Sequence, residues 1–204
     1  MHLFDQRLLG IIILLLLGML VIVKRITTGY ILDKPNGELM IQLTNIFNLF
    51  FLLVINPFAA IFLITGSVAT IDPTHLVIPE SGLLKVFEAV ALAFYVIGYL
   101  MMAWSLVTLK RNYQLGGIAP RPTDTIVTNG PYRLVRHPMY AAALSIALGL
   151  ACLIQSWGFL SLFCIYLLLI FLLIPVEENA LRKKYGEQYR LYKLKTRKLI
   201  TLIY

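Results

Sequence analysis

The chain has 204 residues, of which 59% are hydrophobic and 14% are charged, and its formal net charge is +8. Soluble domains are closer to about one half apolar and one quarter charged. This composition excludes an intrinsically disordered chain and a disulfide-stabilised scaffold. The apolar residues gather in blocks long enough to cross a bilayer, so the sequence predicts an all-α, multi-pass membrane protein.

Five transmembrane spans are expected in chain order, each long enough or nearly long enough at about 1.5 Å per residue. They cover residues 8–23, 39–66, 83–109, 139–154 and 157–174. Only Gln155 and Ser156 separate the last two spans, which predicts an antiparallel helical hairpin.

The basic residues predict how these spans are oriented. Most of the 18 lysines and arginines lie at 24–34, at 110–138 or after residue 175, whereas the loop at 67–82 has none. Because basic loops stay in the cytoplasm, we expect the N-terminus outside and the C-terminus in the cytoplasm. The same distribution argues against a nucleic-acid partner, since the basic residues lie in short segments between or after the apolar spans, as topology signals do.

Two patterns inside the spans indicate contacts between helices. Ala141, Ser145 and Gly149 repeat every fourth residue, and this stripe is expected to pack against the span at 157–174 or against another subunit. Four amides share one face of the second span: Gln42, Asn45, Asn48 and Asn56. They would either bond to neighbouring helices or line a polar substrate channel.

The segment 123–140 has the sequence TDTIVTNGPYRLVRHPMY and lies on the expected cytoplasmic face. Gly130-Pro131 predicts a turn after a short extended stretch. Pro138 suits the first turn of the fourth span, whose free backbone N–H groups would then lie beside Arg136 and His137. A helix start of this kind predicts an anion site.

An acidic pair, Glu177-Glu178, stands in the otherwise basic C-terminal segment. Pro175 is expected to end or kink the fifth span just before it. Either the carboxylates pair with nearby basic residues, or one of them receives the ammonium group of a ligand. Beyond the pair, residues near helical spacing predict an amphipathic helix at the cytoplasmic membrane surface: Leu181, Tyr185, Tyr189 and Tyr192.

An anion site close to a carboxylate and to tyrosine rings suits a zwitterionic ligand that also carries a cation, such as S-adenosylmethionine. At these same residues the sequence resembles the isoprenylcysteine carboxyl methyltransferase family. The resemblance covers about residues 105–198 and is carried by GPYRLVRHPMY, by Glu177-Glu178 after an apolar hairpin, and by YGEQYRLY. Members are integral membrane enzymes that use S-adenosylmethionine, and phospholipid methyltransferases are more distant relatives.

The resemblance implies methyl transfer from S-adenosylmethionine to a lipophilic acceptor, such as a prenylcysteine-like carboxylate, thiol, phenol, amine or lipid head group. By position, it assigns ten residues to cofactor binding: Asp124, Thr125, Ile126, Val127, Tyr132, His137, Pro138, Met139, Tyr140 and Glu177. It implies no metal, and no catalytic residue is assigned. A general base is needed only for an amine or hydroxyl acceptor, and His137 or Tyr189 would then be the candidates.

We therefore expect one membrane domain over residues 1–204, with two spans and an outer loop in 1–82 and the cofactor-binding methyltransferase core in 83–204. One departure from the family concerns the acceptor: members usually carry an arginine four residues before the first glutamate, where this chain has Leu173. Because a buried anion needs a cation, this change favours an acceptor that is neutral or weakly acidic near the reacting atom.

Two other functions remain open. An NADPH-dependent enzyme similar to sterol reductases would have a comparable cytoplasmic pocket, but its phosphates would favour basic residues over Glu177. A non-catalytic helical protein that assembles partners in the membrane would leave the Glu177-Glu178 pair without a role. A multi-histidine metal site is excluded because the histidines are scattered, at His2, His75 and His137.

Overall fold

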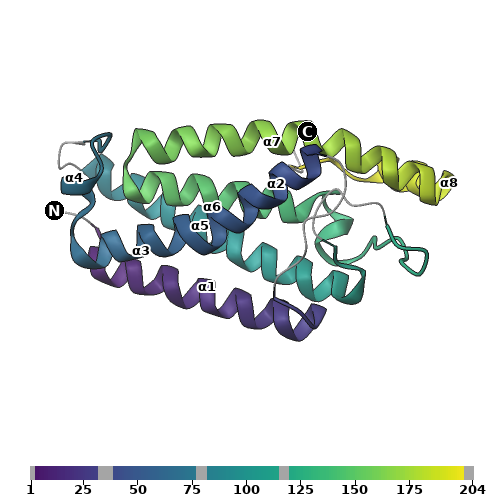
Figure 1. Ribbon diagram of the computed structural model, residues 1–204, viewed down its shortest axis with the longest axis horizontal. Helices are drawn as coiled ribbons and strands as arrows, with labels where there is room; N and C mark the ends of the chain where they lie inside the picture. The colour runs from purple at the N-terminus through teal and green to yellow at the C-terminus, as the bar shows by residue number, and fades with distance from the viewer. Residues whose placement is uncertain (1–2, 32–38, 77–81, 115–119, 200–204) are drawn as a thin grey trace.

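The computed structural model describes residues 3–31, 39–76, 82–114 and 120–199. Every regular element in these ranges is helical, as the apolar blocks predict (Figure 1). The elements are α1 (Gln6–Thr28), α2 (Leu39–Phe50), η1 (Phe51–Ile55), α3 (Asn56–Thr65), α4 (Val68–Ile71), α5 (Gly82–Leu109), η2 (Lys110–Asn112), η3 (Gly130–Arg133), α6 (Pro138–Ile154), α7 (Trp157–Tyr185) and α8 (Glu187–Lys195).

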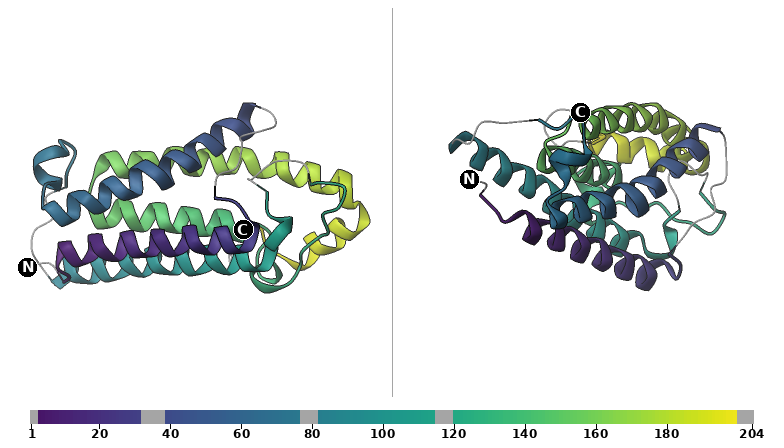
Figure 2. Two further views of the ribbon diagram at one scale, coloured as in Figure 1. Left: turned by 60° about the horizontal axis from the view of Figure 1, so that its bottom comes forward. Right: turned by 60° about the vertical axis from the view of Figure 1, so that its left-hand side comes forward.

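Four continuous helices in the described ranges are long and apolar enough to cross a membrane. They are α1, the run Leu39–Thr65 made by α2, η1 and α3, then α5 and α7. The fifth expected span, α6, has only 17 residues, about 26 Å at 1.5 Å per residue. Its length leaves the count of five unconfirmed, although α6 runs along α5 inside the bundle (Figure 2).

The close contact between α5 and α6 depends on a glycine. A Cβ on Gly149 would lie 2.7 Å from the backbone nitrogen of Tyr95, so only glycine lets the two helices approach this closely. Ser145 Oγ donates to the carbonyl of Phe94 at 2.8 Å. The small-residue stripe therefore packs against α5, and the expectation that it packs against α7 was wrong. The short link between α6 and α7 determines that these two helices are antiparallel. It does not determine which face of α6 packs against α5 and which against α7.

The predicted hairpin of α6 and α7 is confirmed. Gln155 ends α6 in the left-handed region at φ 54°, and its N–H bonds to the carbonyl of Ala151. Ser156 is the N-cap of α7, and its hydroxyl accepts from the N–H of Phe159 at 3.3 Å.

A π-helical turn, η1, joins α2 to α3. Pro57 has no N–H, so the carbonyl of Leu53 lacks its usual helical donor. The backbone N–H of Asn56 bonds instead to the carbonyl of Phe51, five residues back. The Asn56 side chain donates to that carbonyl at 2.9 Å and accepts from the hydroxyl of Tyr95 on α5 at 2.8 Å. The amide thus holds the widened turn against a neighbouring helix.

Asn48 makes a similar contact on the other side of α2, where it accepts a hydrogen bond from the hydroxyl of Tyr166 on α7. Bonds to neighbouring helices were one of the two uses predicted for the amides of the second span, and Asn48 and Asn56 confirm it.

The helix α7 does not end at Pro175 but continues to Tyr185, so that expectation of an end was wrong. Proline is tolerated here because buried residues on both sides, such as Ile174 and Glu178, keep the helix packed. The break comes at Gly186, with φ 50° and ψ −120°, and α8 follows. After α8 the chain returns to the start of α6, where the N–H of Arg136 donates to the carbonyl of Arg197 at 2.7 Å.

Candidate cofactor and acceptor cavity

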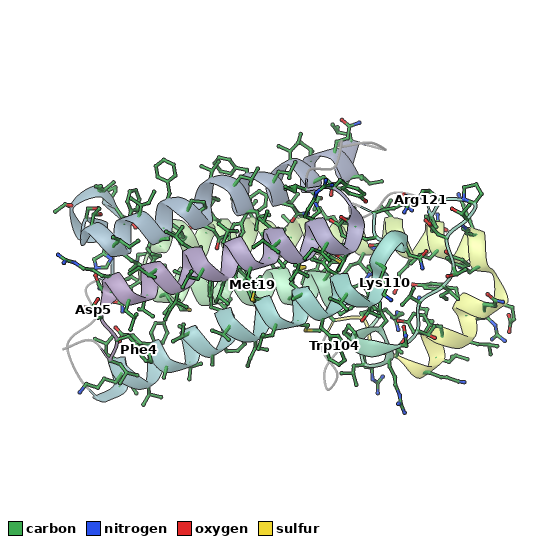
Figure 3. All side chains as sticks on the ribbon, turned by 90° about the horizontal axis from the view of Figure 1, so that it is seen from below. Phe4, Asp5, Met19, Trp104, Lys110 and Arg121 are labelled. Atoms are coloured by element: carbon green, nitrogen blue, oxygen red, sulfur yellow. The ribbon has the colours of Figure 1, made fainter. Side chains whose placement is uncertain are left out.

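A cavity of about 280 Å³ lies inside the bundle near α8. Figure 3 labels Lys110 and Arg121 at this end of the molecule and Asp5 at the opposite end. Helices α1, α2, α5, α6, α7 and α8 all contribute to its wall. All ten residues that the resemblance assigns to a cofactor line this one cavity: Asp124, Thr125, Ile126, Val127, Tyr132, His137, Pro138, Met139, Tyr140 and Glu177.

The segment 124–127 follows an irregular path along the wall, where the resemblance implies a strand-like stretch. Asp124 holds it in place: its Oδ2 accepts from the side-chain nitrogen of Gln114 at 2.6 Å and from the N–H of Arg121 at 2.8 Å. Arg121 Nε also lies 3.2 Å from Asp124 Oδ1. The hydrogen bonds of the Asp124 carboxylate therefore stabilise the conformation of the loop in which Asp124 lies.

Tyr132 enters the wall from the short helix η3. This helix begins at Gly130, whose φ of +56° and close approach to Thr108 both require glycine. The hydroxyl of Tyr192 on α8 donates to the carbonyl of Tyr132 at 2.6 Å. Burial raises the pKa of Tyr132 well above its usual value, and the nearby Glu177 acts in the same direction. Burial also raises the pKa of Tyr192 to about 12, so both phenols keep their protons at neutral pH.

His137 connects the start of α6 to the acidic pair on α7. Its Nδ1 lies 3.7 Å from Glu177 Oε2, and its Nε2 lies 3.5 Å from Glu178 Oε1. Both separations are longer than a good hydrogen bond. The ring stacks on Tyr140 at a centroid distance of 5.6 Å and an interplanar angle of 16°. His137 is thus fixed by packing more than by either carboxylate.

The two glutamates have different roles in the structure. Glu178 Oε1 lies 2.9 Å from Arg136 Nε and its Oε2 lies 2.9 Å from Lys193 Nζ, so this carboxylate closes an ion-pair network between α6, α7 and α8. Arg136 also donates to the carbonyl of Thr196. Pairing with basic residues, one of the two interpretations of the acidic pair, therefore holds for Glu178.

The expected anion site at the start of α6 is partly filled by the protein itself. The Arg136 guanidinium is used by Glu178 and by the C-terminal segment, and the N–H of His137 donates to the carbonyl of Lys198 at 3.0 Å. The first helical bond of α6 is from the N–H of Ala141 to His137, which leaves the earlier N–H groups of Met139 and Tyr140 for a ligand.

Several polar atoms converge on the cavity without a hydrogen bond to the described residues. These buried atoms are Glu177 Oε2, His137 Nε2, Tyr140 Oη and Tyr189 Oη. Buried polar atoms normally have partners, so four of them around one cavity indicate a polar ligand. A carboxylate with phenol and imidazole groups around it suits a ligand that carries an ammonium group.

The tyrosines of the C-terminal segment are placed differently from the expectation. Leu181 and Tyr185 belong to α7, whereas Tyr189 and Tyr192 belong to α8 and are buried. All four line the cavity. These four residues therefore face the cavity, and a helix lying at the cytoplasmic membrane surface stays a prediction. Spacing alone does not distinguish an apolar face that meets lipid from one that meets a protein pocket.

The sequence did not identify the contribution of the first span, from which Leu20, Val21 and Lys24 of α1 line the cavity. Asn48 and Asn56 of the second span also line it, which agrees with the second use predicted for the amides of that span. The only signal for Lys24 was its position beside Arg25 at the end of a span, which is also an ordinary topology signal.

Leu173 is fully buried on α7 and is not among the residues that line the cavity. Replacing it with arginine would therefore disturb the core before it reached an acceptor. The cavity wall also includes Lys24 of α1, a cation that the argument for a neutral acceptor did not consider.

Comparison with known proteins identifies the class. The family model for phospholipid methyltransferase matches residues 86–188, which include most of α5, all of α6 and α7, and the start of α8. The chain therefore belongs to the phospholipid methyltransferase family and is a membrane methyltransferase. This assignment does not favour the reductase or the non-catalytic alternative.

Two individual proteins are similar. The fold matches a eukaryotic intramembrane Ras methyltransferase, isoprenylcysteine carboxyl methyltransferase, with a TM-score of 0.53 and 18% identity over 92% of this chain and 74% of that chain. The cobalt-zinc-cadmium resistance protein CzcN of Cupriavidus metallidurans is 41% identical over 56 residues, which are 28% of this chain and 26% of that protein. The match thus spans about a quarter of the length of CzcN.

Proposed function

We propose that this methyltransferase takes its methyl group from S-adenosylmethionine, bound in the cavity from the cytoplasmic side, and transfers it to a lipophilic acceptor that enters from the bilayer. The observation that carries the proposal is the composition of the cavity. It joins the half-buried carboxylate of Glu177, whose Oε2 is buried, to an apolar wall from α1 and η1 that includes Leu20, Val21 and Leu52. A polar cofactor and an apolar acceptor would therefore meet in one cavity.

The residues fit the charges of this cofactor. Glu177 would receive its ammonium group, and the free N–H groups of Met139 and Tyr140 at the start of α6 would receive its carboxylate. The rings of Tyr132, Tyr140 and Tyr189 supply faces that stabilise a cation. Asp124, Thr125, Ile126, Val127, His137 and Pro138 would complete the enclosure, which is the role that the family pattern gives them.

When bound, S-adenosylmethionine supplies an electrophilic methyl group on a sulfonium. The protein contributes orientation and exclusion of water, since burial of the cavity strengthens the electrostatic contacts made inside it. A carboxylate or thiolate acceptor requires no general base. An amine or a hydroxyl acceptor does, and the buried Nε2 of His137 is the group on the wall that could take a proton. Burial raises the pKa of Tyr189, so its phenol keeps its proton at neutral pH and does not serve as that base.

The proposed topology has five spans, with α6 as the short fifth, the N-terminus outside, and α8 and the cofactor side of the cavity in the cytoplasm. Basic residues at the α8 end support it, including Lys110, Arg136 and Lys193. We also propose a single membrane domain over residues 1–204. Within it, the first 82 residues supply cavity wall as well as two spans, and residues 83–204 form the cofactor-binding core.

Transfer of label from [methyl-³H]S-adenosylmethionine in sealed vesicles tests this proposal. Because the compound does not cross membranes, inverted vesicles that contain the protein should incorporate label into solvent-extractable lipophilic material, and right-side-out vesicles should not. Label incorporated only by right-side-out vesicles would reverse the topology. No lipophilic label in either preparation, compared with vesicles that lack the protein, would contradict the function.

A further inference from the structure

Two asparagines of the second span, Asn48 and Asn56, line the cavity, and the structure uses them differently. Both ends of the Asn56 amide are occupied: its nitrogen donates to a backbone carbonyl of η1, and its oxygen accepts from the hydroxyl of Tyr95. Asn48 has only its oxygen occupied, by the hydroxyl of Tyr166. Within the described residues, its amide nitrogen therefore has no hydrogen-bond partner, although such a group can donate two hydrogen bonds.

Tyr166 on α7 fixes the orientation of the Asn48 amide. The tyrosine ring is stacked with Phe47 and Phe51, at centroid distances of 5.0 and 5.9 Å and interplanar angles of 27° and 23°. Because the oxygen of the amide is turned toward the Tyr166 hydroxyl, its nitrogen is turned away from it. Asn48 is half-buried, and its nitrogen keeps accessible surface. The nitrogen is therefore an oriented donor in the cavity wall that a ligand can reach.

The part of the wall that follows Asn48 on the second span is apolar, and its residues are Leu49, Phe51, Leu52 and Leu53. An N–H group without a partner costs free energy in apolar surroundings, so polar groups at membrane depth normally find one. An oxygen atom of a ligand would complete the Asn48 amide. Because the amide carries no charge, a neutral oxygen such as a carbonyl is sufficient.

Asn48 lies well away from the proposed position of the cofactor ammonium. Its partner Tyr166 precedes Glu177 by eleven residues on α7, which is about 16 Å of helix at 1.5 Å per residue. S-adenosylmethionine carries its reactive methyl group only a few bonds from its ammonium. A ligand oxygen at Asn48 would therefore belong to the lipophilic part of the acceptor, away from the atom that receives the methyl group.

We propose that Asn48 determines which acceptors are used, by donating a hydrogen bond from its amide nitrogen to an oxygen within the lipophilic part of the methyl acceptor. The acceptor is then an amphiphile with a carbonyl, ether or phenolic oxygen set back from its reacting group, and not a plain hydrocarbon chain. Tyr166 is a positioning residue, because it acts through Asn48. This inference rests on the proposed function, because it takes the acceptor to occupy the same cavity.

Octanophenone and octylbenzene test the assignment, because octanophenone has a carbonyl where octylbenzene has a methylene group. Each is titrated calorimetrically into purified protein in one non-ionic detergent, and comparing one probe between two proteins cancels its partition into micelles. Asn48→Leu removes the donor and keeps a side chain of similar size. It should weaken binding of octanophenone about fivefold, which is about 1 kcal/mol, and leave the affinity for octylbenzene unchanged.

Gln42→Leu is the matched control, because it removes an exposed amide of the same helix that does not line the cavity, and it should change neither affinity. Tyr166→Phe keeps the donor but frees its orientation, so it should weaken octanophenone less than Asn48→Leu does, again without effect on octylbenzene.

If Asn48→Leu does not purify in folded form because the buried Tyr166 hydroxyl loses its partner, Asn48→Leu combined with Tyr166→Phe replaces it. The double variant removes both partners and should show the same loss for octanophenone. A wild-type protein that binds octanophenone no more tightly than the variant without the donor, or an equal loss for both probes, would overturn the proposal.

S-adenosylhomocysteine, titrated into the same variants, separates this inference from the proposed function. Its affinity should be unchanged by Asn48→Leu. A loss of affinity for S-adenosylhomocysteine equal to that for octanophenone would assign Asn48 to the cofactor and overturn the inference. A wild-type protein that binds no S-adenosylhomocysteine would contradict the proposed function, whatever the titrations with octanophenone give.

Discussion

Glu177→Gln should lower the affinity for S-adenosylhomocysteine about tenfold or more while the protein stays folded. The change keeps the shape of the side chain but removes a charge-assisted hydrogen bond to the ligand ammonium, worth about 1.5–3 kcal/mol. Folding should be little affected because the nearest ionic contact of Glu177 in the described structure is His137 at 3.7 Å. Isothermal titration of the two proteins in the same detergent measures the difference.

Glu187→Gln is the matched control. Glu187 lies on the exposed side of α8 and pairs with Arg190 at 2.6 Å, away from the cavity wall. The Glu187→Gln substitution removes the same charge and should leave the dissociation constant for S-adenosylhomocysteine at its wild-type value. If Glu177→Gln also binds as tightly as the wild type, Glu177 does not receive the ammonium group and the cofactor assignment loses its main contact.

Arg136→Met should be the most destabilising of these changes, lowering the free energy of unfolding by about 3 kcal/mol. The substitution leaves the buried carboxylate of Glu178 without its guanidinium partner, and it removes the donor to the carbonyl of Thr196. Lys193, which is half exposed, can compensate only in part. Thermal unfolding in detergent, followed by circular dichroism, measures the loss.

Two further variants separate the ion pair from general damage. Arg136→Met with Glu178→Met should recover some of the lost stability, because no unpaired buried charge remains. Arg190→Met breaks an exposed pair and should leave the unfolding temperature nearly unchanged. An Arg136→Met protein as stable as the wild type would show that the network does not hold α8 to α6 and α7.

The candidate site was largely predictable because its residues occur in two short, dense motifs. Gly130 and Pro138 determine local geometry through turn and helix-start chemistry, and both residues behave as that chemistry requires. The apolar blocks likewise predicted the helices, since length and hydropathy are local properties. Of the two outcomes expected at Pro175, an end and a kink, the end does not occur, because packing on both sides of the proline, not the local sequence, decides whether α7 continues.

What could not be predicted depends on contacts between distant segments. Glu177 and Glu178 are adjacent in sequence but face directions about 100° apart on α7. Which one is paired depends on how α8 and the segment before α6 pack against α7, since these bring Lys193 and Arg136 to Glu178. The place of Lys24 in the cavity wall is similarly hidden, because no local pattern tells which of two basic residues at the end of a span turns inward.

Titration of the wild-type protein with S-adenosylhomocysteine, with NADPH as the comparison ligand, tests the central claim most directly. The cavity wall carries an acid, Glu177, which would repel the phosphates of a nicotinamide cofactor, and its Arg136 is already paired with Glu178. Saturable one-to-one binding of S-adenosylhomocysteine, with no heat from NADPH and no displacement by it, is the predicted result. Binding of NADPH in the absence of any binding of S-adenosylhomocysteine would contradict the account.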